Sequence, residues 1–337
     1  MNPSKQNKRM SRKIIAASLA TILLSGSLAA CSTDNGKADD GRPLVYTSLY
    51  TLYDFATKIG GEHIAIDYVI PADGGAHDWE PSPSDIAILE EADAFIYNGA
   101  GLEHWVDDVL NTLENENLIV LNTSDKVELI DGDSHSHDHD HDEEDEDSST
   151  GHDEDETHED EHSHDVDPHI WLSPVNVKLQ MEAIKDLFIE LDPEHADTYE
   201  QNYETQAVAL DELDREFMEG LENLRSRELV VSHEAFAYMA DRYHLHQQGV
   251  EGLTPHSEPD ASRMAEIIDF IKAEGIEVVF FEELEGTQVA DTIAAETNIK
   301  TASLSPLEKY TAEQIAAGED YFSKMRRNLA TLIEYLG

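Results

Sequence analysis

The sequence predicts an α/β protein with two lobes, each built on a mostly parallel sheet, joined by a long rigid helix. Short runs of apolar and β-branched residues alternate with helical patterns, and this alternation occurs twice along the chain. A long helical pattern separates the two series. Because strands that alternate with helices form parallel sheets, and ligands bind such sheets at the carboxyl ends of the strands, a site is expected in the cleft between the lobes.

The first lobe is expected over residues 43–172. Its strands are predicted where apolar and β-branched residues run together, and its helices where apolar residues recur at helical spacing. The expected strands span residues 44–48, 64–70, 94–97 and 118–122. The expected helices span residues 53–59, 84–89 and 105–113.

A helical segment is expected over residues 173–226, between the lobes. Ser173 and Asp192 each precede a proline, which pairs an N-cap residue with proline at the first helical position. At about 1.5 Å per residue, the helix expected over 193–218 is about 40 Å long. Its apolar or aromatic positions are Tyr199, Tyr203, Leu210, Leu213 and Phe217. It could be the core helix of a bundle, but strand patterns on both sides favour a stiff connector.

The second lobe is expected over residues 227–337, where the alternation of strands and helices resumes. The expected strands span residues 229–232, 278–281 and 301–304. The expected helices span residues 235–243, 262–273, 287–297 and 321–336.

The N-terminus is typical of a secreted protein. A positively charged start precedes an apolar stretch over 14–24 that is too short for a permanent membrane helix. The following Leu-Ala-Ala-Cys ends at Cys31 and resembles the lipobox of bacterial lipoproteins, in which the cysteine is lipidated. This predicts a signal peptide over 1–30, a lipidated cysteine with a tether over 31–42, and a protein anchored to the extracytoplasmic face of the cell membrane. The alternative is a signal peptide with a chance cysteine.

The chain is strongly acidic, with 73 Asp and Glu against 22 Lys and Arg and a formal net charge of −51. Such a surface repels nucleic acid and anionic lipid, so neither is expected as a partner. It suits a protein that handles cations, although an adaptation for solubility explains the charge equally well. Cys31 is the single cysteine, so no internal disulfide is expected and the fold must depend on its core.

An insert over residues 131–166 contains eight histidines among many Asp and Glu residues and no Lys or Arg. With almost nothing apolar to bury, it is expected to be disordered. Imidazole and carboxylate both bind divalent cations, so the insert is predicted to be an accessory zinc collector, and a solubilising loop is the alternative. Its candidate ligands are His135, His137, His139, His141, His152, His158, His162 and His164.

Four side chains follow expected strand ends or precede a helix, namely His77, His169, His233 and Glu308. Three imidazoles and one carboxylate form a borderline-soft set that suits Zn²⁺. Spacing alone is weak evidence, because a single histidine at a strand end is more often an ordinary polar residue.

The contexts of these residues strengthen the interpretation. The most specific stretches are Ala-His-Asp-Trp-Glu-Pro at 76–81 and Asp-Pro-His-Ile-Trp at 167–171. Together with the lipobox and the acidic insert, they resemble the zinc-binding lipoproteins that supply bacterial ABC zinc importers. These belong to the metal-specific class of substrate-binding proteins with a rigid interdomain helix. The resemblance covers about residues 43–337.

The resemblance implies that His77, His169 and His233 are the imidazole ligands and that Glu308, or a water in its place, completes the set. Manganese-specific relatives use two histidines and two carboxylates, so a third imidazole favours Zn²⁺, although Cu²⁺ or Ni²⁺ could bind as tightly in vitro. Each ligating histidine should donate its second nitrogen to a carbonyl or carboxylate, and Asp167 and Glu80 are the candidate acceptors.

The resemblance implies a monomeric protein, not an enzyme, that captures Zn²⁺ and delivers it to an ABC permease. Release is expected to need only modest shifts of the loop bearing Glu308 or His233. The alternatives are a manganese-binding lipoprotein of the same class, a surface zinc buffer or adhesin, and a zinc hydrolase with Glu308 or Glu234 as base.

Other polar residues have no motif around them. The acidic pair at 282–283 is expected at a solvated edge. Histidines expected on helices or loops, with surface or core roles, are His63, His104, His195, His244, His246 and His256.

Overall fold

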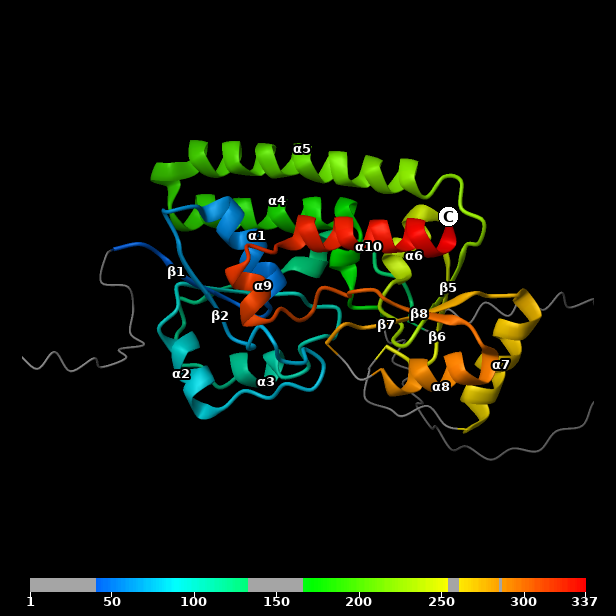
Figure 1. Ribbon diagram of the computed structural model, residues 1–337. Coiled ribbons are helices and arrows are strands. Elements are labelled where there is room, and N and C mark those ends of the chain that lie inside the picture. The colour runs from blue at the N-terminus through cyan, green and yellow to red at the C-terminus, as the bar shows by residue number, and fades with distance from the viewer. Residues whose placement is uncertain (1–40, 133–165, 254–260, 285–286) are drawn as a thin grey trace, which may run out of the picture. The chain divides into compact units, whose positions relative to one another are not determined.

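The computed structural model describes residues 41–132, 166–253, 261–284 and 287–337 (Figure 1). The predicted signal peptide, Cys31, His256 and all eight accessory histidines of the insert lie outside these residues. Within the described ranges, no helix combines the length and apolar character that crossing a membrane requires.

The first sheet has four parallel strands in the order β2-β1-β3-β4. The neighbours β1 and β3 are not consecutive in the chain, so the strand order reverses between them. In open parallel sheets, ligands bind beyond the carboxyl ends of the strands at such a reversal. The strands are β1 (Leu44–Thr47), β2 (Ala65–Tyr68), β3 (Ala94–Tyr97) and β4 (Ile119–Asn122). The helices between them are α1 (Tyr50–Gly60), α2 (Pro83–Glu90) and α3 (Val106–Leu110).

The second sheet repeats this topology, with parallel strands in the order β6-β5-β7-β8. It therefore has a reversal of its own, between β5 and β7. The strands are β5 (Glu228–Val231), β6 (His246–Gly249), β7 (Val278–Phe281) and β8 (Lys300–Ser303). The helices are α6 (Ala237–Tyr243), α7 (Ala261–Glu274), α8 (Gln288–Thr297), α9 (Ala312–Ala316) and α10 (Tyr321–Leu336). The predicted α/β class with two parallel sheets is confirmed.

Two long helices connect β4 of the first sheet to β5 of the second. Helix α4 (Pro174–Leu191) begins with the predicted proline, and a 3₁₀ turn (Pro193–His195) separates it from α5 (Ala196–Gly220). The predicted helix therefore begins at 196 rather than at 193. Figure 1 shows α5 running beside α4, and α5 also packs against α1 and α10. The connector thus packs against three neighbouring helices, and its stiffness stays a prediction.

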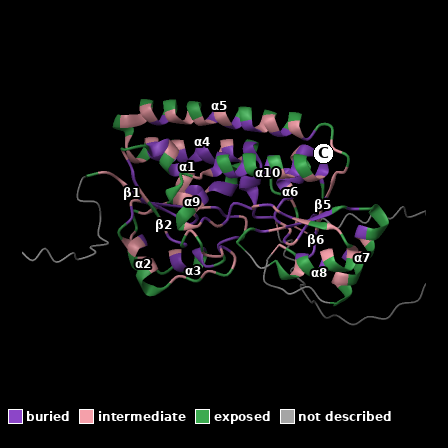
Figure 2. Cartoon of the chain, in the orientation of Figure 1, coloured by how far each residue is buried: buried purple, intermediate pink, exposed green. Residues whose placement is uncertain are grey.

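One large apolar core includes residues of both sheets and of α4, α5 and α10. Alternation along the strands divides each sheet between this core and a smaller one. Val45 and Ile96 contribute to the shared core, whereas Tyr46 and Phe95 contribute to a cluster under α2 and α3. Figure 2 shows buried residues along the strands and the inner helices, and exposed residues along the outer side of α5. Loops at the strand ends are therefore attached to a continuous packed interior.

One strand and one α-helix were not predicted from the sequence. Strand β6 reads His-Gln-Gln-Gly, which lacks β-branched residues, and it forms because its backbone pairs with β5 at the sheet edge, with His246 opposite Glu228. The expectation that His246 lies on a helix or loop was therefore wrong. Helix α9 has only five residues and none of them is buried, so it leaves little apolar pattern to detect.

Candidate metal centre

The fold brings His77, His169, His233 and Glu308 together, with one ligand atom of each within 4.8 Å of the others. Among the residues that the structure describes, no other group of three or more His, Cys, Asp or Glu side chains meets this spacing. His77 follows β2, His233 follows β5 and Glu308 follows β8, while His169 lies on the segment that leads into α4. Strand ends of both sheets thus supply donors to one point.

The spacing of three of the donors is close to that of tetrahedral coordination. His77 Nε2 lies 3.2 Å from His169 Nε2, His169 Nε2 lies 3.1 Å from Glu308 Oε1, and His77 Nε2 lies 3.7 Å from Glu308 Oε1. Ligands at about 2.0–2.1 Å from a tetrahedral Zn²⁺ are about 3.3–3.4 Å apart. The distances among three of the four donors are therefore already close to the edge length of such a tetrahedron.

The centre is enclosed by protein. The exposed fraction is 0% for His169, 1% for His233 and 5% for Glu308, and His77 is partly buried. A buried donor set excludes solvent from a bound ion, and it makes each uncompensated charge costly unless a neighbouring group balances it.

Asp167 orients His169. The carboxylate Oδ1 of Asp167 accepts hydrogen bonds from His169 Nδ1 at 2.8 Å and from the backbone nitrogen of His169 at 2.7 Å. This fixes the ring with Nε2 directed at the cluster, and it confirms Asp167 as the predicted acceptor. Burial lowers the pKa of His169, but Asp167 and Glu308 outweigh it and raise this pKa to about 10.

Glu308 and His169 form a charged pair. Burial favours the neutral acid, but the imidazoles of His169 and His77, whose Nε2 atoms lie 3.1 and 3.7 Å from Glu308 Oε1, hold the pKa of Glu308 well below its ordinary value. Burial also lowers the pKa of His77, so His77 is the imidazole that stays neutral most readily. A metal ion that binds His169 Nε2 must displace the proton that this nitrogen carries in the imidazolium form.

Glu282 supports His233, a role that the sequence analysis missed. His233 Nδ1 donates to Glu282 Oε1 at 2.6 Å, and His233 Nε2 donates to the Leu253 carbonyl at 2.8 Å. Because both nitrogens face acceptors, this arrangement suits the imidazolium form. Burial lowers the pKa of His233, but the hydrogen bond to Glu282 contributes to raising it. Glu282 is only 6% exposed, so its expected place at a solvated edge was wrong.

The position of Glu282 follows from strand order. It comes directly after β7, and β7 pairs with β5 through Phe280 and Val231. Adjacent parallel strands end at the same edge, so the residue after β7 lies beside His233, which follows β5. A search for carboxylates at neighbouring strand ends would have found this contact if the pairing had been known.

Glu80, the other candidate acceptor, does not support a ligand. Its Oε1 lies 2.9 Å from His104 Nε2, and both side chains are exposed. The prediction for Glu80 was therefore wrong, because the loop directs its side chain outward to a surface histidine. His63 and His195 also lie away from the cluster, where their rings stack with centroids 3.8 Å apart.

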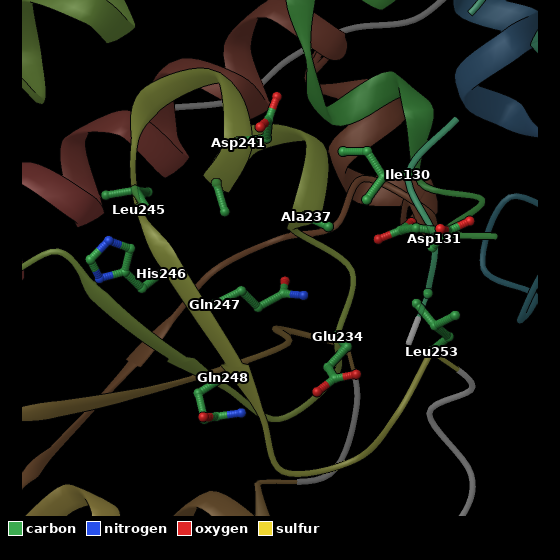
Figure 3. A pocket seen from close by; sticks show the side chains of 13 residues that line it. Ile130, Asp131, Glu234, Ala237, Asp241, Leu245, His246, Gln247, Gln248 and Leu253 are labelled. Carbon is green, nitrogen blue, oxygen red and sulfur yellow. The ribbon is translucent and has the colours of Figure 1, made fainter. Parts of the chain in front are cut away.

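Glu234 points into a different cavity and is not part of the donor set. Figure 3 shows its side chain between Gln247 and Leu253. These residues line a cavity of about 430 Å³, which Asp131 also lines. Its Oε1 accepts a hydrogen bond from the backbone nitrogen of Gly249 at 3.3 Å. A Cβ atom at Gly249 would lie 1.9 Å from Glu234 Cγ, so the glycine makes room for this side chain.

Comparisons with known proteins agree with this geometry. Residues 45–335 match the family described as ZnuA, zinc-uptake complex component A, periplasmic. The chain is 32% identical to the high-affinity zinc uptake system protein ZnuA of Bacillus subtilis, over 96% of each chain. It is 36% identical to the zinc-binding protein AdcA of Streptococcus pyogenes, over 87% of this chain but only 56% of that protein.

A solved structure shows the same fold. The crystal structure of the Zn(II)-bound ZnuA-like domain of Streptococcus pneumoniae AdcA superposes with a TM-score of 0.71 at 30% identity, covering 88% of this chain and 99% of that domain. The similarity therefore covers the part of the chain that forms both sheets.

Proposed function

The chain belongs to the ZnuA family of zinc-uptake complex components, and we propose that it captures Zn²⁺ at His77, His169, His233 and Glu308 and delivers it to an ABC permease. The observation that carries this proposal is the convergence of three imidazoles and one carboxylate within 4.8 Å of one another. Three nitrogens and one oxygen at this spacing are a donor set that zinc prefers.

The donor set favours zinc over manganese. Manganese binds best to oxygen-rich sites with more than four ligands. Here Glu308 is the one carboxylate of the cluster, since Asp167 and Glu282 are each engaged with the outer nitrogen of a histidine. Both carboxylates increase the basicity of their imidazoles, which strengthens binding to a borderline-soft ion.

The arrangement suits binding of a cargo ion rather than catalysis. Four protein donors fill a tetrahedral shell, so no position remains for a reacting water. The zinc hydrolase alternative needs a carboxylate base beside the ion. Glu308 occupies a ligand position, and Glu234 is held against Gly249 in another cavity.

The place of the protein in the cell follows from its N-terminal sequence. Lipidation at Cys31 would anchor the chain at the extracytoplasmic face of the membrane, where the tether over 32–42 gives the zinc-binding part access to a permease. We propose that it acts there as a monomer and that the histidine-rich insert collects zinc weakly. The domain boundaries proposed above, at residues 43, 173 and 227, place this insert within the first lobe.

Competition titration tests the proposed function. The chain from Ser32 onward is stripped of metal and titrated with Zn²⁺ and with Mn²⁺ against a chelator of known affinity, with and without residues 133–165. The expected result is one tight zinc site in both forms, far weaker manganese binding, and loss of the tight site in His169→Ala. His104→Ala is the matched control, since His104 is exposed and lies outside the cluster. Tight zinc binding that disappears with residues 133–165 would show that the insert, not the cluster, is the functional site.

A further inference from the structure

The loop that carries Glu308 is bonded to segments far away in the sequence. Trp171 Nε1 donates to the Pro306 carbonyl at 2.7 Å, and the Thr51 hydroxyl donates to the Leu307 carbonyl. At the far end of the loop, the Tyr310 nitrogen donates to the Ala72 carbonyl at 2.6 Å. The segments that carry His77 and His169 therefore hold one side of this loop.

Helix α10 holds the other side. Asn328 bonds to both the nitrogen and the carbonyl of Ser305, at 2.9 and 2.6 Å. One turn earlier on the helix, Lys324 Nζ donates to the Lys309 carbonyl at 2.6 Å. Residues on both sides of Glu308 are thus attached to a single rigid helix.

The backbone next to Glu308 is strained. Leu307 has a φ of +62°, in the left-handed region that non-glycine residues rarely adopt. Such a conformation is unfavourable for a residue with a side chain, and it persists only where surrounding contacts enforce it. The Leu307 side chain is fully buried, so the loop cannot relax by turning this residue into solvent. The contacts with Lys324 and Asn328 oppose that relaxation.

Lys324 is an unusual residue for this position. It is 1% exposed, and no carboxylate of the described residues forms an ion pair with its ammonium group. Its Nζ instead lies 3.9 Å from the centre of the Tyr310 ring and donates to the Lys309 carbonyl. Burial lowers its pKa to about 8, opposed by Glu283 and Glu319. A buried lysine destabilises a fold unless its contacts compensate, and here those contacts go to the two residues that follow Glu308.

We propose that Lys324 is a positioning residue for the metal centre, which holds Glu308 at the zinc against the backbone strain at Leu307. The inference rests on the proposed function, because it assigns a role in zinc binding to a residue that does not touch the ion. Lys324 acts through the Lys309 carbonyl and the Tyr310 ring. It also lines a small cavity together with Glu282, the residue that supports His233.

Zinc affinity of Lys324 variants tests this inference. Lys324→Met keeps the aliphatic stem and removes the donor, and it is expected to weaken zinc binding about ten- to a hundredfold, the usual effect of losing a group that supports a ligand. Lys324→Arg keeps a cationic donor and should restore part of the affinity. Lys300→Met is the matched control, because Lys300 also lies over an aromatic ring, 5.8 Å from the centre of Tyr335, but contacts no ligand loop.

A double-mutant cycle separates positioning from a merely structural role. Leu307→Gly relieves the strain that Lys324 opposes, but it also removes a buried side chain, so its own effect on zinc binding is measured separately and its folding is checked by circular dichroism. Within that background, Lys324→Met should weaken zinc binding several-fold less than it does in the unsubstituted chain. Equal losses in both backgrounds, or no loss in Lys324→Met, would overturn the inference. If Lys324→Met does not fold, as judged by circular dichroism of the metal-free protein, Lys324→Gln replaces it in the cycle.

The outcomes also distinguish this inference from the proposed function. Absence of a tight zinc site in the unsubstituted chain would contradict the proposed function itself. A tight site in the unsubstituted chain that Lys324→Met leaves unchanged would refute only the role of Lys324.

Discussion

Zinc binding should release at least one proton even at pH 8. The pKa of His169 is about 10 because Asp167 and Glu308 outweigh the effect of burial, so this imidazole is protonated in the metal-free protein at pH 8. Zinc must displace that proton. Three histidines with ordinary pKa values of about 6.5 would together release only about 0.1 proton at this pH. The two expectations differ by about tenfold.

The same shift sets the pH dependence of the affinity. At pH 8, removing a proton from a group with a pKa of about 10 reduces the apparent affinity about a hundredfold, or about 2.7 kcal/mol. The apparent zinc affinity should therefore rise about tenfold per pH unit between pH 7 and pH 9, whereas three ordinary histidines would raise it only about twofold over the whole range. Below that range the other histidines add to the slope.

Calorimetry measures the proton release directly. Zinc is titrated at pH 8 in two buffers with different ionisation enthalpies, and the difference in heat gives the number of protons released. Asp167→Asn removes a negative charge that raises the pKa of His169, so this variant should release clearly fewer protons than the unsubstituted chain. Asp269→Asn, at an exposed position on α7, is the matched control and should behave as the unsubstituted chain. Release of about 0.1 proton by the unsubstituted chain would refute the charged pair of His169 and Glu308.

Three further predictions follow from the site and its surroundings. Glu282→Gln should weaken zinc binding about tenfold, because His233 loses its carboxylate partner. Glu283→Gln, at the exposed neighbouring residue, should leave zinc binding unchanged. Equal effects of the two substitutions in competition titrations would contradict this role of Glu282. Gly249→Ala should lower the free energy of unfolding by about 2 kcal/mol or more in urea denaturation, because its Cβ would lie 1.9 Å from Glu234 Cγ and 2.6 Å from the Glu251 carbonyl. Gly252→Ala is the control, because a Cβ at Gly252 would meet no atom within 4 Å. Similar losses of stability in the two variants would argue against the clash at Gly249. The raised pKa of His169 stabilises the metal-free fold fully below about pH 6.5, and this stabilisation is lost as pH rises towards the folded-state pKa of about 10. The melting temperature of the metal-free protein should therefore fall from pH 7 to pH 9.5, and that of Asp167→Asn should fall less. Parallel curves for the two proteins would contradict this linkage between protonation of His169 and stability.

The sequence predicts most of the fold because its signals are local. Apolar runs such as Val278–Phe281 and the proline that begins α4 each depend on neighbouring residues only, and the structure has both elements as predicted. Strand β6 could not be predicted in this way, because His-Gln-Gln-Gly has no strand preference of its own. It forms through backbone pairing with β5, and that pairing depends on the assembled sheet.

The residues of the candidate site could likewise be predicted only where a local sequence motif surrounds them. His77 and His169 stand in specific motifs, and the structure places both with His233 and Glu308 in one cluster. Glu282 has no motif, and its contact with His233 arises because β5 and β7 are neighbours although they are not consecutive strands. Lys324 could not be predicted for a related reason, since a lysine on a helix is normally solvated and its contact with Lys309 depends on how α10 packs against the loop.

X-ray absorption at the zinc edge tests the central claim most directly. The chain from Ser32 without residues 133–165 is loaded with one equivalent of zinc, so that the signal comes from the cluster and not from the insert. The expected spectrum shows four nitrogen or oxygen ligands at about 2.0–2.1 Å with strong scattering from imidazole rings, and Glu308→Gln should alter the oxygen contribution while the imidazole scattering persists. A six-coordinate, oxygen-rich shell with weak imidazole scattering would contradict a zinc site formed by three histidines and Glu308.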